Sequence, residues 1–274
     1  MGVDRRQHAL FRRFPIDGSA AVDGRLLPTP YHVYDGTLWM LGGTAEAGAA
    51  ASLLGEGLVP LLDTKGRALM AVWVGDFTQA SLGPHQELQL SLFASTRPLP
   101  PVADHPFAIH RALLVQPGVR MVCVALWNST PQVARYNAGH LGLNAHVAEG
   151  RLAQEEEGGH WSFRFERPDG ALLAEGGVRQ AVRSSPAMGW RLLRHMGLQG
   201  AWRLLRAPYL SVPVAAPGSQ SVAQTHTHSD RQAVRPWAPG DGVAIAHPRY
   251  APLDFCGAFV QHMMGLRFVY LRPR

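Results

Sequence analysis

A chain of 274 residues is long enough to build its own hydrophobic core. Its hydrophobic fraction of 46% excludes disorder of the whole chain, because that much apolar surface offsets the loss of chain entropy. The net charge of +6 comes almost entirely from arginines scattered along the chain, without a basic block, so we expect no nucleic-acid partner.

The N-terminus lacks the apolar segment of a secretory signal, and no run approaches the roughly twenty apolar residues of a membrane span. The two cysteines, Cys123 and Cys256, lie in apolar contexts without CxxC spacing, which argues against a disulfide framework or a metal site. We therefore expect a cytoplasmic protein without membrane contact, metal or other cofactor.

In chain order, residues 1–30 have the glycines and prolines of a peripheral arm, and residues 31–274 are expected to form one domain. Strand-forming residues follow at 31–41, and an alanine-rich helix is predicted at 45–54. The apolar run at 68–77 predicts a strand that is buried on both faces.

A polar loop is expected at 78–87, followed by a strand in which Leu88, Leu90 and Leu92 alternate with polar residues, the pattern of a half-buried strand. The proline-rich segment 97–106 is a connection. Further strands are predicted at 119–127, in a hairpin around the Pro-Asp-Gly turn at 168–170, and at 266–271.

The sequence WRLLR occurs at 190–194 and again at 202–206. A basic amphipathic stretch of this kind binds membranes or acidic partners in some proteins. We favour the alternative that two helical turns pack Trp and Leu on the barrel, because Gly197, Gly200 and Pro208 interrupt any long helix.

Two segments carry residues suited to chemistry: SLGPHQEL at 81–88 and GLNAHVA at 142–148. Together with the order of strands and helix before them, they resemble the acetoacetate decarboxylase family. Its members carry a pocket glutamate in the first segment and a Schiff-base lysine in the second. The resemblance implies a mostly β (α+β) fold, a closed cone-like β-barrel with peripheral helices and an internal pocket.

The chain departs from this family at the lysine. Ala145 stands at the lysine position, and the only lysine of the chain, Lys65, lies in a polar turn. A solvated lysine is protonated at neutral pH and is a poor nucleophile. We therefore predict that the protein does not use Schiff-base catalysis.

The remaining candidates are acid–base and polar groups. Glu87 and His146 are the candidate catalytic residues, because a carboxyl in an apolar pocket or an imidazole exchanges protons near neutral pH. The candidate substrate-binding residues are His85, Arg135, His140 and Asn144. Each has an ordinary structural alternative, such as a solvent-facing strand-end glutamate or a partly buried histidine.

His226 and His228 alternate on a strand, so that both rings face the same side, a geometry that some metal sites use. The sequence offers no third ligand as a motif, and we favour a hydrogen-bonded surface strand.

These observations leave three functions open. The first is a lyase-type enzyme of small-molecule or secondary metabolism, acting on a keto acid or related carbonyl compound by acid–base chemistry. The second is a non-catalytic protein that keeps the pocket and binds a small carbonyl or carboxylate ligand. The third is an interaction protein using residues 189–206. We expect a homo-oligomer.

Overall fold

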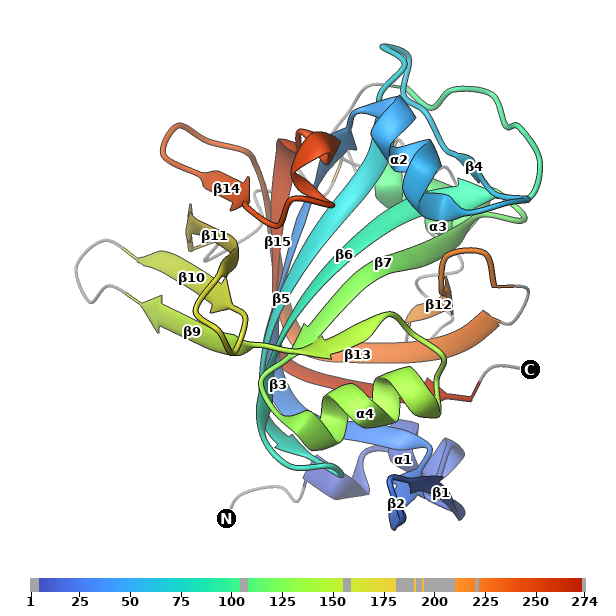
Figure 1. Cartoon of the computed structure of the whole chain (residues 1–274), viewed down its shortest axis with the longest axis vertical. Coiled ribbons are helices and arrows are strands. Elements are labelled where there is room, and N and C mark those ends of the chain that lie inside the picture. The colour runs from blue at the N-terminus through green and yellow to red at the C-terminus, as the bar shows by residue number, and fades with distance from the viewer. Residues whose placement is uncertain are drawn as a thin grey trace.

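The computed structural model describes residues 5–103, 108–154, 159–180, 190, 194, 210–219 and 222–272. Seven strands of this part of the chain form the main sheet: β3 (Tyr31–Ala45), β5 (Ala68–Ala80), β6 (His85–Ser95), β7 (Arg120–Asn128), β12 (Leu210–Ala215), β13 (Val222–Pro236) and β15 (Cys256–Leu271). They pair in the order β6, β5, β3, β15, β13, β12 and β7, and β7 pairs back with β6 to close a barrel (Figure 1). The predicted fold class is confirmed.

Short elements surround the barrel. Strands β4 (Val59–Pro60) and β8 (Ala145–Val147) extend the sheet beside β6 and β7. The described helices that follow β3 are α2 (Ala47–Leu54), α3 (Ala108–Val115), α4 (Pro131–Gly139) and the 3-10 turn η2 (Ala251–Leu253). None of the described helices is long and apolar enough to cross a membrane.

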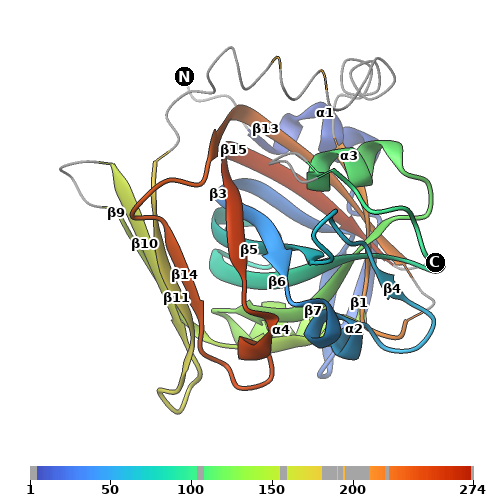
Figure 2. The ribbon, with the colours of Figure 1, turned by 90° about the horizontal axis from the view of Figure 1, so that it is seen from above.

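A second sheet lies against the outside of the barrel as a separate layer (Figure 2). Its strands, in order, are β14 (Gly242–Ile245), β11 (Leu172–Arg179), β10 (His160–Glu166) and β9 (Glu149–Gln154). Phe163 and Phe165 of β10 join Trp39 and Leu41 of β3 in one buried cluster between the layers. The β10–β11 hairpin forms at the predicted turn.

Alternation along the barrel strands separates two apolar clusters. On β6, Leu88 and Leu90 belong to the outer cluster beneath the second sheet, whereas Glu87 and Gln89 point into the barrel. The strand is therefore covered on both faces, and the prediction that its polar face meets solvent is wrong. The physical reason is that the closed barrel turns this face toward its own interior.

The strands are longer than the sequence predicted. The β5–β6 ladder continues through the pair Phe77–His85, and β5 ends only at Ala80. The connection is therefore limited to residues 81–84. Polar residues on β5 and β6 obscured this extension, because strand signals based on hydrophobicity fade where a strand reaches the surface.

The N-terminal segment has more structure than an arm of turns. It forms η1 (Arg5–Gln7), α1 (Ala9–Arg13) and a hairpin of β1 (Gly18–Val22) and β2 (Arg25–Thr29). Asp23 and Gly24 both have positive φ, as a two-residue hairpin turn requires. Leu10 and Phe11 are buried with Val269 of β15. The division into an arm and one domain stays a prediction.

The repeated WRLLR stretch lies outside the described residues, apart from Trp190 and Arg194, whose side chains are exposed.

Close packing between β3 and β15 gives a stability prediction. A Cβ atom at Gly42 would lie 2.0 Å from Cε1 of Phe259, which is fully buried. We expect Gly42→Ala to lower the free energy of unfolding by about 1–3 kcal/mol, because the buried ring must shift to admit the added Cβ. Chemical denaturation measures this. Gly139→Ala is the matched control, since nothing lies within 4 Å of its added Cβ. Equal stability of both variants would contradict the prediction.

Candidate active site

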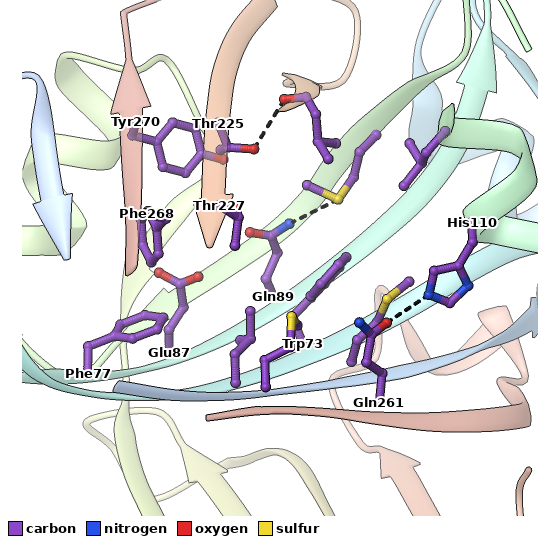
Figure 3. A pocket seen from close by; sticks show the side chains of 16 residues that line it. Trp73, Phe77, Glu87, Gln89, His110, Thr225, Thr227, Gln261, Phe268 and Tyr270 are labelled. Carbon is purple, nitrogen blue, oxygen red and sulfur yellow. Dashed lines mark hydrogen bonds between the residues drawn. The ribbon is translucent and has the colours of Figure 1, made fainter. Parts of the chain in front are cut away.

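A cavity of about 110 Å³ lies inside the barrel, between its strands and α3. Figure 3 shows Glu87 and His110 at its two ends, with Gln89 between them. Most of the remaining wall is aliphatic or aromatic, including Trp73, Phe77 and Phe268. The inward side chains of β3, β5, β6, β13 and β15 meet here because every second residue of each strand faces the barrel interior.

Glu87 is the carboxyl group of this cavity. Its Oε2 accepts a hydrogen bond of 2.9 Å from Nδ2 of Asn128, the residue opposite it on β7. Asn128 in turn accepts a hydrogen bond of 3.0 Å from Nδ2 of Asn137 on α4. Both asparagines are buried. This chain of amides fixes one carboxyl oxygen of Glu87.

Burial raises the pKa of Glu87 to about 7, and the hydrogen bond from Asn128 opposes part of this rise. Some of the residue's surface is accessible, but that surface faces the cavity, and protein surrounds the carboxyl group. We therefore regard the carboxyl as buried. Desolvation disfavours the charged form, so Glu87 takes up and releases a proton near neutral pH.

His85 lies behind the cavity wall. Its ring contacts Phe77 at 5.0 Å between centroids. Nδ1 donates to the Gly83 carbonyl at 3.0 Å, so Nε2 accepts from the Tyr31 hydroxyl at 2.9 Å. Burial lowers the pKa of His85 to about 4, despite the Gly83 bond. His85 is thus a neutral support of the site and does not line the cavity.

The end of the cavity opposite Glu87 was missed by sequence reasoning. Nε2 of His110, on α3, lies 2.7 Å from Oε1 of Gln261. Nε2 of Gln261 in turn donates a hydrogen bond of 2.8 Å to Oε1 of Gln232. Burial lowers the pKa of His110, so the ring is neutral. Nothing in the sequence around 108–115 distinguishes this histidine, because its role depends on where α3 crosses the barrel.

Two further lining residues carry hydrogen-bond donors. The indole N–H of Trp73 and the hydroxyl of Tyr270 are buried and have no hydrogen-bond partner among the described residues. Burial first, and then the charges of Cys123 and Glu87, raise the pKa of Tyr270 well above its ordinary value. Tyr270 is therefore a neutral donor near Glu87. The sequence did not indicate that Tyr270 lines the cavity, because it lies in an apolar C-terminal strand without a motif.

The segment 142–148 reaches the barrel through β8, which pairs in parallel with β7. Ala145 lies opposite Leu126 and packs with the inner apolar cluster. His146 is exposed, and its Nε2 lies 3.0 Å from Oδ1 of Asn144. Asn144 donates to the Val124 carbonyl at 2.7 Å. Neither His146 nor Asn144 lines the cavity, so we do not retain them beside Glu87.

Two other candidates also lie away from the cavity. Arg135 is exposed on α4 and forms an ion pair of 2.9 Å with Asp23 of the N-terminal hairpin. His140 ends α4, and its Nε2 lies 3.1 Å from Oγ1 of Thr29. Both hold α4 against the hairpin, and their structural partners account for their positions.

The candidate nucleophile Lys65 and the candidate metal ligands His226 and His228 also lie outside the Glu87 cavity. Lys65 is exposed in its turn. His226 and His228 point outward, because Thr225 and Thr227, which alternate with them along β13, face the cavity. His226 stacks on Phe14 at 4.2 Å. Within the described ranges, no group of three or more His, Cys, Asp or Glu side chains is arranged to hold a metal ion.

Comparison with known proteins now assigns the fold. No protein-family model and no curated protein matches the sequence. Among solved structures, acetoacetate decarboxylase from Legionella pneumophila is similar over 100% of this chain and 97% of its own, with a TM-score of 0.59 and 10% identity. A second acetoacetate decarboxylase structure is similar over 100% and 96%, with a TM-score of 0.53 and 10% identity.

The enduracididine biosynthesis enzyme MppR, complexed with pyruvate, is similar over 92% of both chains, with a TM-score of 0.54 and 11% identity. The protein therefore has an acetoacetate decarboxylase-like fold, as the sequence resemblance implied.

The raised pKa of Glu87 predicts how stability depends on pH. The folded-state pKa of about 7 lies above the ordinary value of 4.5, so this group's contribution is fully present below pH 4.5 and is lost as pH rises through 7. Glu87→Gln removes that dependence. Between pH 4.5 and pH 7, the free energy of unfolding of the wild type should fall by up to about 3 kcal/mol relative to this variant. Denaturation series at several pH values measure the difference.

Asn128→Ala is the companion variant, because it removes the hydrogen bond that favours the charged carboxyl. We expect the pKa of Glu87, followed by carbon-13 NMR of the carboxyl, to rise further. A pKa near 4.5 in the wild type would refute the buried environment.

Proposed function

We propose that this protein is an enzyme that uses the Glu87 carboxyl group for acid–base catalysis on a small carbonyl compound, without a Schiff base. One observation carries the proposal: a single carboxyl group, among the described lining residues, stands in an apolar cavity with its pKa raised to about 7. General acid–base groups work best when their pKa lies near the working pH.

The chemistry that suits this arrangement is proton transfer at the carbon next to a carbonyl. The Glu87 carboxylate takes the proton, and the electrons of the broken C–H bond move into the carbonyl, giving an enolate. The carboxylic acid then returns the proton to carbon or oxygen, or gives it to a leaving hydroxyl in a dehydration. Neutral donors such as the Tyr270 hydroxyl are suited to stabilise the enolate oxygen.

The position of the chain's only lysine supports chemistry without a Schiff base. A catalytic lysine is activated by desolvation or by a neighbouring cation. Lys65 is exposed in the turn before β5 and does not line the cavity. The MppR structure complexed with pyruvate supports a small carbonyl ligand for a cavity in this fold.

A non-catalytic binding protein is the alternative function. It is favoured by the second end of the cavity, where His110 is neutral and hydrogen-bonded to Gln261. Such an end recognises a polar group without contributing a second acid or base. The two functions differ in whether bound ligand exchanges protons.

The variant Glu87→Gln distinguishes the catalytic function from the binding function. The amide keeps the size and much of the hydrogen bonding but cannot transfer a proton. We expect α-proton exchange of ketones and keto acids in D₂O, followed by proton NMR, to fall at least about 100-fold in the variant, while ligand affinity persists. Glu56→Gln, at an exposed carboxyl group, is the control and should exchange like the wild type. Exchange that is absent from the wild type across the panel, with binding intact, would establish the binding protein.

The absence of an activated lysine predicts the result of a trapping experiment. Incubation with acetoacetate or pyruvate followed by borohydride should leave no covalent adduct, because Lys65 is exposed and outside the cavity. Intact-mass spectrometry measures this, with a lysine-dependent member of the fold as the positive control. A stable adduct on Lys65 would contradict acid–base catalysis without a Schiff base.

A further inference from the structure

The wall of the Glu87 cavity is apolar over most of its extent. Its aliphatic side chains come from four strands and α3: Leu38, Met40, Leu113, Met121, Val212 and Met263. Burial of apolar ligand surface against such a wall is favourable by roughly 25 cal/mol per Å². The body of a ligand that fits here is therefore hydrocarbon-like.

The charges around the cavity are unfavourable for an anion. Glu87 is the only acidic side chain among the described lining residues, and none of them is lysine or arginine. The ring of His110 is neutral because burial lowers its pKa. A ligand carboxylate would thus be buried near Glu87 without a cation, and an unpaired buried charge costs several kcal/mol.

A cationic ligand could pair with the Glu87 carboxylate, but a buried ion pair offsets its desolvation only when the remaining N–H groups are also hydrogen-bonded. Glu87 already accepts a hydrogen bond from Asn128, and the surrounding wall supplies few acceptors for the N–H groups of an ammonium. The other polar lining groups are neutral and lie at separate places, with Gln261 hydrogen-bonded to His110 and Gln89 donating to Ser91 at 2.6 Å. Neutral amides and hydroxyls recognise carbonyl and hydroxyl oxygens.

From these features we propose that the cavity binds an uncharged carbonyl compound with an apolar body, on the order of ten non-hydrogen atoms in size, and discriminates against keto-acid anions. The size follows from the cavity volume of about 110 Å³. This inference rests on the proposed function and narrows its substrate class. The carbonyl lies at the Glu87 and Tyr270 end, and the apolar body lies against the aliphatic wall between that end and His110.

Two probes that differ by one charge and one methyl group test this inference. Calorimetry at pH 8 compares methyl 4-oxopentanoate, which is neutral, with 4-oxopentanoate, which is an anion. We expect the ester to bind at least about tenfold more tightly, which corresponds to about 1.4 kcal/mol. Pentylammonium is the cationic probe and should bind more weakly than the ester.

Leu38→Phe shows whether the ester occupies this cavity. The larger side chain fills space next to Met40, so the ester should lose at least about tenfold in affinity. Glu56→Gln lies outside the cavity and should bind the ester like the wild type. If Leu38→Phe does not fold, NMR contacts between the ester and Phe268 in the wild type locate the ligand instead.

Equal or tighter binding of either charged probe would overturn the proposal, as would failure of the ester to bind below about 10 mM. An ester affinity unchanged by a folded Leu38→Phe, or a lack of contacts with Phe268, would also overturn it. These measurements do not depend on turnover. Preferential ester binding with no exchange by the wild type would therefore refute the enzyme and leave the ligand class supported.

Discussion

Pairing of β6 with β7 closes the barrel, and the environment of Glu87 depends on this closure. The ladder joins Glu87 to Asn128 and continues to Ala94 opposite Arg120, with one irregularity near Leu90 and Ser91. In an open sheet the polar face of β6 would meet water, and a carboxyl there would have an ordinary pKa. Closure encloses that face, and the outer leucines are covered by the second sheet.

The same ladder also limits the effect of burial on Glu87. Asn128 stands directly opposite Glu87, so the strand register itself brings the amide donor to the carboxyl. Asn137 holds Asn128 from α4, and the Tyr31–His85 pair fills the space behind Phe77. Burial without the hydrogen bond from Asn128 would favour the protonated acid still more strongly. The balance between desolvation and one hydrogen bond places the pKa near neutrality.

Similarity to acetoacetate decarboxylase structures extends over nearly the whole chain, but identity near 10% limits it to the fold. Within this fold Ala145 and Gln89 lie on either side of Leu126, in register across three strands. A lysine at position 145 would therefore begin close to the inner face that Glu87 and Gln89 share. The alanine methyl group instead packs with the inner apolar cluster, consistent with a cavity whose described lining residues contribute no cation.

The sequence alone predicted the mostly β fold class, strands at 31–41, 68–77 and 119–127, the hairpin at 168–170 and Glu87 as a candidate residue. These follow from local patterns: strand periodicity, turn residues and a motif of adjacent residues. It did not place His110, Gln261 or Tyr270 together, because α3 and the C-terminal strand meet β6 only through barrel closure. His85 shares a face of β6 with Glu87, and only the packing of its ring against Phe77 and its hydrogen bond to Tyr31 show that it does not line the cavity. The sequence also gave no reason to separate Ala145 from His146. Adjacent strand residues point to opposite faces, and only the tertiary structure decides which face is the interior.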